Sequence, residues 1–243
     1  MRRSRPKDES IAVGPAAARS SEMLPQGKAL LLPRPKLATG GSLADALRRR
    51  QTTREIGGRA LGRQLLSDLL FAACGVNRRR GPFGGVGVTA ASASNSQEID
   101  VYVLLREGAF LFDRRRHALV RVSGEDIRRL ALGPRQPPVS PDAPVELVFV
   151  VDVDRLEHTT GFEEPGLHDP EVQKSYYFVD TGIIAANVYL FAASRNLACW
   201  FHNCDRPALA SKLGLRKAEH ALFAQTVGFR AGLRKEVAHA DKR

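Results

Sequence analysis

Cysteine is scarce in this 243-residue chain, which has only three. An odd number cannot all pair within one chain, so a disulfide framework is not expected. Cys199 and Cys204 are close in sequence but lack the second pair of ligands that a structural zinc site requires. We therefore predict that Cys74, Cys199 and Cys204 are reduced and structural, and that the chain has no metal site.

A secretory signal and a long hydrophobic run are also absent. The charged start is followed by residues 11–19, which are interrupted by glycine and proline and end in charge rather than in an apolar core. The uncharged stretch 181–194 is shorter than the roughly 20 residues of a transmembrane helix. We therefore expect a cytoplasmic protein without a membrane partner, in which residues 176–194 form a buried central helix.

Acidic residues are few, and the formal net charge is +11. Residues 1–50 contain eleven Lys or Arg against four Asp or Glu, so +7 of this charge lies in the first fifth of the chain. A nucleic-acid-binding arm would have this sign, but no aromatic side chain is present there to stack on bases. We favour a disordered basic leader over residues 1–30 and no nucleic-acid partner.

The rest of the composition suits one folded domain at residues 31–235, with a tail at residues 236–243. Hydrophobic residues make up 43% of the chain, which at this length is enough to bury a sizeable core. Residues 145–151 form an almost continuous apolar run, typical of a strand that is covered on both faces at the centre of a sheet. A hairpin is expected between residues 99–105 and 109–112, with Gly108 supplying a positive φ.

Other elements follow from periodicity and from capping signals. The pattern predicts a helix over 65–73 that ends at a left-handed Gly75, a helix starting near Ile127, a short helix within 207–215 and a last strand over 221–229. Residues 156–170 are rich in His and acidic residues, but their spacing matches no metal site. We expect a solvated loop there, which is a candidate substrate lid.

A turn of small and polar residues precedes the strand at 99–105. Ser92, Asn95 and Gln97 bring hydroxyl and amide groups that can both donate and accept hydrogen bonds. Small neighbours such as Ala93 let the backbone approach a flat ligand. The turn suits the polar edge of a heterocycle such as a flavin, although taken alone the pattern is more typical of a polar loop before a strand.

A second polar cluster lies upstream, at the end of an amphipathic segment that begins at Ser42. Arg50 and Arg54 offer two planar guanidinium groups, and Thr52 between them offers a hydroxyl. These groups can converge on one phosphate if the chain turns here. The alternative is a solvated helix end, whose arginines complement the negative end of the helix dipole.

Together, the two clusters resemble the FMN-dependent nitroreductase family. The Arg-x-Thr-x-Arg run at 50–54 and the Ser-Ala-x-Asn-x-Gln turn at 92–97 are similar to the motifs of that family. The flanking residues look like the branch that contains azoline dehydrogenases of the SagB type. The resemblance spans roughly residues 30–230 and implies a dimeric α+β fold, in which helices flank a central mixed or antiparallel sheet around a buried central helix.

The resemblance implies FMN as the cofactor and a phosphate site formed by Arg50, Gln51, Thr52 and Arg54. Gln51 stands where relatives often have a second basic residue. Relatives also use a basic residue just past the last strand, which makes Arg234 a candidate for the same site. Arg54 would alternatively lie near the flavin ring and favour the reduced cofactor electrostatically.

The resemblance also implies a homodimer with FMN at the subunit interface. The turn with Ser92, Asn95 and Gln97 would face the flavin of the partner, and the backbone of His202 and Asn203 would lie near the reactive flavin nitrogen. The His202 side chain is a candidate proton donor, but a hydrogen-bonded scaffold residue is the more common role for a histidine at a strand end.

The implied activity is electron transfer from NAD(P)H through FMN to a small organic acceptor such as a nitroaromatic or a quinone. Two alternatives remain open. In an azoline dehydrogenase of peptide tailoring, a base made of Lys and Tyr is expected, and the stretch 174–177 is the nearby candidate. A non-enzymatic flavin-binding or partner-binding module would fit Gln51 and Ala91, which depart from the family pattern and predict weaker FMN binding.

Overall fold

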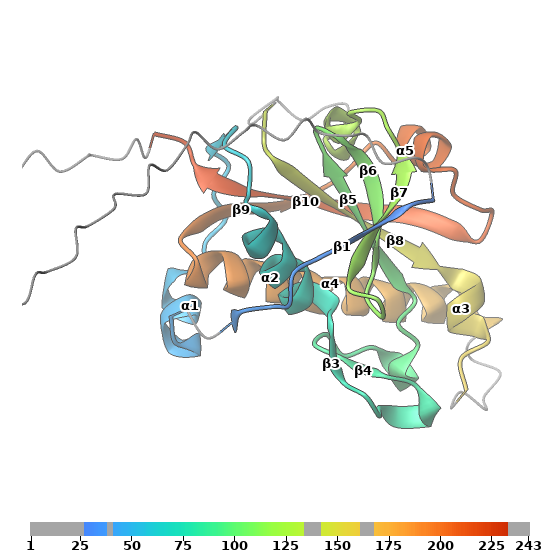
Figure 1. The fold of residues 1–243 in the computed structure, drawn as a ribbon. Coiled ribbons are helices and arrows are strands. Elements are labelled where there is room, and N and C mark those ends of the chain that lie inside the picture. Colours follow the sequence, from blue (N-terminus) through green and yellow to red (C-terminus); the bar gives the residue numbers. More distant parts are fainter. Residues whose placement is uncertain (1–26, 38–40, 134–141, 161–167, 233–243) are drawn as a thin grey trace, which may run out of the picture.

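An antiparallel β-sheet forms the centre of this computed structural model, which describes residues 27–37, 41–133, 142–160 and 168–232. The strand order is β1-β7-β6-β5-β8-β10-β2, and β9 also pairs with β10 (Figure 1). The described sheet strands are β1 (Ala29–Leu31), β2 (Ile56–Gly57), β5 (Ile99–Leu105), β6 (Gly108–Asp113), β7 (Ala118–Ser123), β8 (Val145–Asp152), β9 (Leu197–His202) and β10 (Glu219–Arg230).

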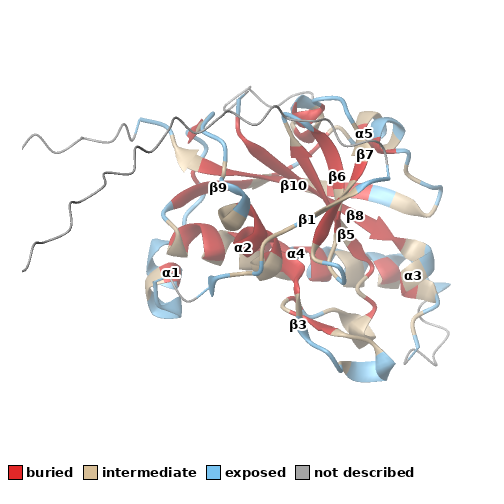
Figure 2. Cartoon of the chain, viewed as in Figure 1, coloured by how far each residue is buried: buried red, intermediate tan, exposed pale blue. Residues whose placement is uncertain are grey.

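Strand β8 is the buried centre that its apolar run predicts. All of its residues are buried, and it pairs with β5 on one side and with β10 on the other. Figure 2 shows this burial as the red middle of the sheet. A strand with both faces covered gains from apolar side chains in both directions, which explains why no alternation of polar residues is needed here.

Helices cover the two faces of the sheet. One face packs against α2 (Arg63–Cys74) and α4 (Pro170–Ser194), and α1 (Leu43–Arg49) packs on α4. The other face packs against α5 (Arg206–Leu213) and the 3-10 turn η4 (Arg128–Ala131). The short helix α3 (Val153–Glu157) follows β8. This arrangement confirms the predicted α+β class, with an antiparallel rather than a mixed sheet.

Helix α4 starts earlier than the predicted boundary at residue 176. The Asp169 side chain caps it by accepting a hydrogen bond from the Glu171 N–H, and Pro170 occupies the first turn. By length and composition α4 could cross a membrane. Its side chains Ile184, Val188 and Phe191 are instead part of the core between the helix and the sheet. The predicted central helix is therefore confirmed with an earlier start.

Two glycines end elements for different physical reasons. Gly214 follows α5 in the left-handed conformation, with φ 65°. Gly75 follows α2 but is extended, with φ −71°, so the predicted left-handed conformation is wrong. A Cβ at Gly75 would lie 2.6–2.8 Å from atoms of Phe71. Close packing, rather than a positive φ, is what favours glycine there.

The predicted hairpin of β5 and β6 is confirmed, and Gly108 has φ +136°. The helix predicted near Ile127 is instead the one-turn η4. Asp126 caps this turn by accepting from the Arg128 N–H, and Gly133 with the following proline prevents a longer helix.

Several elements were not predicted. Strands β1 and β7 pair at one edge of the sheet, and β3 (Val76–Arg78) pairs with β4 (Gly87–Val88) in a separate hairpin. Strand β1 begins at Ala29, within the leader predicted over residues 1–30. Residues 1–26 and 233–243, which include Arg234, lie outside the described residues.

Candidate functional site

The basic segment 50–54 leaves the end of α1 in an extended conformation. Ser42 caps the start of α1 by accepting from the Asp45 N–H, and Arg50 is the C-cap, with ψ 119°. The Thr53 N–H donates to the Cys199 carbonyl over 2.9 Å. The segment is therefore fixed beside β9 in an extended course, without the turn that would bring Arg50 and Arg54 together.

A basic cavity of about 400 Å³ opens beside this segment. With its amide oxygen turned toward Arg230, Gln51 accepts from both terminal nitrogens of that guanidinium, over 3.0 and 3.2 Å. Arg48 is paired with Asp45, and the three other guanidinium groups around the cavity repel each other unless an anion lies between them. The lining residues are Arg48, Arg49, Arg50, Gln51, Ala193, Asn196 and Arg230.

Arg230 is a candidate that the sequence analysis missed. It is the last residue of β10 and pairs with Ile56 of β2, which brings it to the end of the basic segment. The sequence analysis instead chose Arg234, which lies outside the described residues. The position of Arg230 at the end of a long apolar strand could have indicated it. Strand pairing fixes the position of such a residue, whereas a residue in the tail after the strand is not fixed in this way.

Tyr189 of α4 joins the basic segment to β9 and was also missed. Its hydroxyl accepts from the Phe201 N–H over 2.9 Å and lies 3.1 Å from Thr52 Oγ1. The tyrosine hydrogen is therefore available for the Thr52 oxygen. The Arg50 guanidinium lies 5.6 Å from the centre of the same ring. Tyr189 thus contacts both Thr52 and Arg50 and helps to fix their positions.

Arg54 lies apart from the basic cavity. Its guanidinium stacks over Trp200 of β9, 5.4 Å from the ring centre. The two forks predicted to converge on one phosphate are therefore separated, with Arg50 at the cavity and Arg54 over an aromatic ring. Arg54 is exposed, and the ring face of Trp200 helps to keep its guanidinium in place.

The polar turn is a strained bend around η3 (Ala93–Asn95). Ser94, Asn95 and Gln97 all have positive φ values, between 47° and 56°. The Asn95 and Gln97 amides both donate to the Val86 carbonyl, over 3.1 and 2.8 Å. The side chains predicted to bind a ligand edge therefore hold the β3–β4 hairpin, and they stabilise a bend whose backbone is strained.

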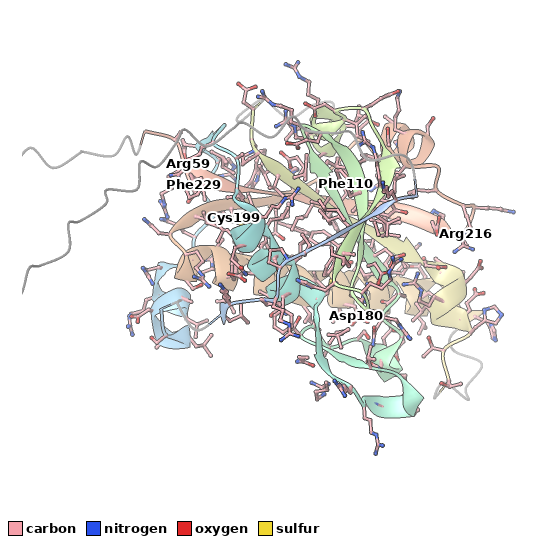
Figure 3. All side chains as sticks on the ribbon, viewed as in Figure 1. Arg59, Phe110, Asp180, Cys199, Arg216 and Phe229 are labelled. Atoms are coloured by element: carbon pink, nitrogen blue, oxygen red, sulfur yellow. The ribbon has the colours of Figure 1, made fainter. Side chains whose placement is uncertain are left out.

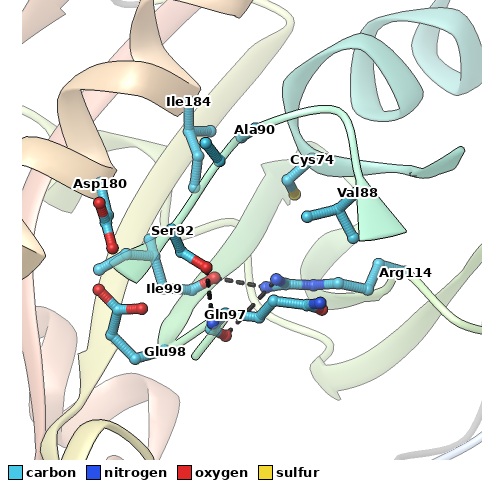
Figure 4. Close-up of a pocket in the computed structure, with 11 residues that line it drawn as sticks. Cys74, Val88, Ala90, Ser92, Gln97, Glu98, Ile99, Arg114, Asp180 and Ile184 are labelled. Carbon is cyan, nitrogen blue, oxygen red and sulfur yellow. Dashed lines mark hydrogen bonds between the residues drawn. The ribbon is translucent and has the colours of Figure 1, made fainter. Parts of the chain in front are cut away.

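A pair of buried carboxyl groups supports this bend from behind. Glu98 is fully buried and accepts from the Ser96 hydroxyl over 2.6 Å, while Asp180 accepts from the Ala93 N–H over 2.9 Å. Figure 4 shows the two carboxyl groups facing each other beside a small cavity. Burial raises the pKa of Glu98 to about 7 and also raises that of Asp180. The pair keeps a proton near neutral pH, because two adjacent buried anions would repel.

The bend and the basic segment contact different levels of α4. The bend is tied to Asp180, and the basic segment contacts Tyr189, nine positions further along the helix. At 1.5 Å per residue this separates the two levels by about 14 Å. Figure 3 shows Asp180 and Cys199, whose carbonyl accepts from the Thr53 N–H, at different places in the molecule. One chain therefore presents the two predicted parts of the site at separate places.

His202 and Asn203 lie at the end of β9. The His202 side chain is buried and hydrogen-bonded through both ring nitrogens, to the Asn203 carbonyl and to the Thr226 hydroxyl. The ring also packs against Trp200, with the centres 4.3 Å apart and the planes tilted by 43°. This is the environment of a scaffold histidine, which also ties down the Asn203 carbonyl at the end of β9.

The other predicted candidates are distributed elsewhere. Lys174 pairs with Glu171 on the first turns of α4, and the Tyr177 ring contacts Phe178. His158 faces the Asp154 carbonyl, and the middle of the candidate lid, residues 161–167, lies outside the described residues. The three cysteines are buried and unpaired. In the described part of the chain, no three His, Cys, Asp or Glu side chains are grouped to hold a metal ion.

Comparison with known proteins identifies the family. The model of the nitroreductase family matches residues 47–229, a range that contains the basic segment, the bend and the end of β9. The chain belongs to the nitroreductase family. A Methanocaldococcus jannaschii protein assigned to the nitroreductases is 30% identical over 162 residues, which cover 64% of this chain and 75% of that protein.

Solved structures agree with this membership. A protein of Ralstonia eutropha JMP134 assigned to the nitroreductases is 32% identical, with a TM-score of 0.70 over 84% of this chain and 90% of that chain. An NADPH:FMN oxidoreductase from Vibrio harveyi, solved with NAD+, shares the fold at 17% identity, a TM-score of 0.53 and coverage of 78% and 69%. The microcin synthetase complex of E. coli shares it at 14% identity, a TM-score of 0.59 and coverage of 75% and 71%.

Proposed function

We propose that this protein is an FMN-dependent oxidoreductase that passes electrons from NAD(P)H to a small organic acceptor such as a nitroaromatic or a quinone. The observation that carries the proposal is the cavity lined by Arg48, Arg49, Arg50 and Arg230 within a nitroreductase fold. A phosphate dianion fits this donor set, because guanidinium groups bind phosphate with two hydrogen bonds each and the cavity has no carboxylate in its lining.

The residues around the cavity have distinct roles in this proposal. Arg50 and Arg230 bind the phosphate, and Gln51 orients Arg230 through its amide oxygen. Thr52, held by Tyr189, is placed to donate to the same group. Gln51 therefore replaces a second basic residue by aligning one that comes from β10, so its departure from the family pattern does not imply loss of the cofactor.

Bound FMN would supply the redox chemistry, which is acceptance of a hydride and release of electrons. The protein positions the ring and stabilises the charge that reduction leaves on it. Arg54 is placed for that role because its guanidinium is fixed over Trp200, away from the phosphate cavity. The end of β9 at His202 and Asn203 supplies backbone groups beside the ring.

A homodimer completes the proposed site. Apolar side chains are exposed on α1 and α4, with Leu43, Leu47 and Val179 at least 60% exposed. Such a face on packed helices favours association with a second apolar surface. A second copy placed there would bring its bend, with Ser92, Asn95 and Gln97, toward the flavin held by the basic segment of the first. This resolves the separation of the two parts along α4.

The second candidate is an azoline dehydrogenase of the SagB-type branch, acting within a peptide-tailoring complex. The shared fold with the microcin synthetase complex supports it. The contacts around 174–177 do not favour it, because Lys174 is paired with Glu171 at the exposed start of α4, which raises the pKa of its ammonium group and makes it a poorer base. We therefore place it second.

One spectroscopic experiment tests the proposal. The purified protein is titrated with FMN, and the complex is then mixed anaerobically with NADH or NADPH. We expect a yellow complex that bleaches with one of the two donors and recovers when a quinone or nitroaromatic is added. A protein that leaves FMN free in solution would refute the cofactor, and a complex that neither nicotinamide reduces would favour the second candidate.

A further inference from the structure

Three polar side chains form a buried line across neighbouring strands on the α5 face of the sheet. They are Glu146 of β8, Thr226 of β10 and His202 of β9. Thr226 is the register partner of Glu146, and His202 is the register partner of Ala224, two residues before Thr226. The side chains of Glu146 and His202 are 3% and 1% exposed, and Thr226 is 1% exposed. The proposed function assigns no role to Glu146 or Thr226.

The three side chains are hydrogen-bonded in series. The Thr226 hydroxyl lies 2.7 Å from Glu146 Oε2 and 2.7 Å from His202 Nε2. The other ring nitrogen, Nδ1, lies 2.8 Å from the carbonyl oxygen of Asn203. The series therefore begins at a carboxyl group in the middle of the sheet and ends on the backbone just after β9.

Counting hydrogens leaves two arrangements. A carbonyl oxygen only accepts, so Nδ1 of His202 must carry a hydrogen. If the ring is neutral, Nε2 accepts from Thr226, and the hydroxyl must in turn accept from a protonated Glu146. If Glu146 is ionised, Thr226 donates to it, and the ring must be an imidazolium that donates from both nitrogens. Both arrangements contain the same number of protons.

The surroundings select the neutral arrangement. Burial raises the pKa of Glu146 to about 8 and lowers the pKa of His202, so both groups favour their uncharged forms. Arg54 already places a cation over Trp200, against which the His202 ring packs, and this disfavours a second cation. The charge of Arg128 acts on Glu146, but Arg128 is paired with Asp126 over 2.6 Å.

We propose that Glu146, as a neutral carboxylic acid, and Thr226 are positioning residues. Their hydrogen bonds all run in one direction toward His202, and His202 in turn fixes the Asn203 carbonyl. Glu146 donates to Thr226, Thr226 donates to Nε2, and the Nδ1 hydrogen is then directed to Asn203. The consequence of this arrangement is a fixed peptide at the end of β9 beside the flavin, and this consequence rests on the proposed function. The tautomer itself is a property of the protein without cofactor.

The first test measures the tautomer by nitrogen-15 NMR of histidine in the protein without FMN, with His202→Gln used for assignment. We expect a neutral ring with its hydrogen on Nδ1 at neutral pH. Glu146→Gln should keep this signal, because an amide N–H can replace the carboxyl donor. Glu146→Met and Thr226→Val should lose it, and Thr226→Ser should keep it. An imidazolium at His202, or Glu146→Gln acting like Glu146→Met, would overturn the proposal.

The second test uses the FMN complex and separates this inference from the proposed function. We expect Thr226→Val to lower kcat roughly tenfold or more at unchanged KM for the nicotinamide, because the peptide beside the ring is no longer fixed. Thr226→Ser is the matched control and should retain kcat. Equal kcat values for Thr226→Val and the unmodified protein would overturn the positioning role. If the unmodified protein does not bind FMN, the proposed function fails, while the NMR result still decides the tautomer.

Discussion

At the scale of single residues, the proposed function assigns Arg50 and Arg54 to different parts of the cofactor. Arg50 lines the basic cavity and lies over Tyr189, whereas Arg54 lies over Trp200. Two arginines four positions apart in sequence thus lie over different aromatic rings, and we propose different roles for them. This follows from the extended course of 50–54 along β9, which a helical continuation of α1 would not allow.

Substitution of the two arginines should therefore give different results. Arg50→Ala removes a charge-assisted hydrogen bond and should weaken FMN binding by about 1.5–3 kcal/mol without changing the reduction potential of bound FMN. Arg54→Ala should make that potential more negative, because a cation near the reduced ring is lost. Fluorescence titration and spectroelectrochemistry measure the two effects. Arg129→Ala, an exposed arginine of η4, is the control. Identical effects of the two substitutions would contradict the division of roles.

The protonation of Glu146 should be visible in stability. Its pKa is 4.5 in a free carboxyl group and about 8 in the fold, so between these values the folded state holds a proton that the unfolded chain releases. Raising the pH through this window therefore favours unfolding, by roughly 1.4 kcal/mol per pH unit.

Glu146→Gln lacks this linkage, so its stability should exceed that of the unmodified protein by an amount that grows with pH. Urea unfolding of both proteins across the window measures the difference. Parallel stability curves would show that Glu146 is ionised in the fold.

At the scale of elements, the sequence predicts what periodicity and capping encode locally. Strand β8, the β5–β6 hairpin, α4 and α5 are found where their patterns indicate them. The extended conformation of Gly75 and the partner of the Asn95 amide could not be predicted, because each depends on packing that no local pattern encodes. Phe71 occupies the space beside Gly75, and the Asn95 amide is used by the β3–β4 hairpin.

The site shows the same limit. The pattern at 50–54 indicates a phosphate site, but it does not indicate that Tyr189 and Arg230 meet this segment. Both lie far along the chain, and only the packing of α4 and the pairing of β10 bring them there. Sequence spacing carries no information about such contacts when the intervening chain is long.

The hairpin gives a prediction at this scale. Gly108 has a positive φ, and a Cβ there would lie 2.2 Å from the Ser123 carbonyl oxygen. Gly108→Ala should therefore reduce the free energy of unfolding by more than about 2 kcal/mol, since the contact is with backbone. Gly182→Ala on α4, where nothing lies within 4 Å, should be neutral or stabilising. Chemical denaturation measures both, and similar losses would contradict the steric argument.

At the scale of the whole molecule, the proposed function requires a second copy. The exposed apolar residues of α1 and α4 lie on one packed pair of helices, and the bend and the basic segment are separate within one chain. A symmetric dimer would cover the exposed apolar residues. Its two-fold axis would also place the basic segment of one chain beside the bend of its partner, and the reverse.

A charge placed on this surface should separate the subunits. Ala186 is exposed on α4, so Ala186→Arg should give a monomer that binds FMN weakly although its own arginines are intact. Ser211→Arg, exposed on α5 on the other side of the sheet, should leave the dimer and FMN binding unchanged. Light scattering and FMN titration measure the two properties. A monomeric Ala186→Arg protein with full FMN affinity would contradict the shared site.

The shared site is tested most directly by mixed dimers. One chain carries Arg50→Ala with Arg230→Ala, the other carries Asn95→Ala with Gln97→Ala, and different tags allow the mixed dimer to be isolated. If each site combines the arginines of one chain with the bend of the other, one site of the mixed dimer bears both lesions and the other bears none. We predict that the mixed dimer binds one FMN with the affinity of the unmodified protein, while both parent dimers bind it weakly. A mixed dimer that binds FMN no better than its parents would contradict the account.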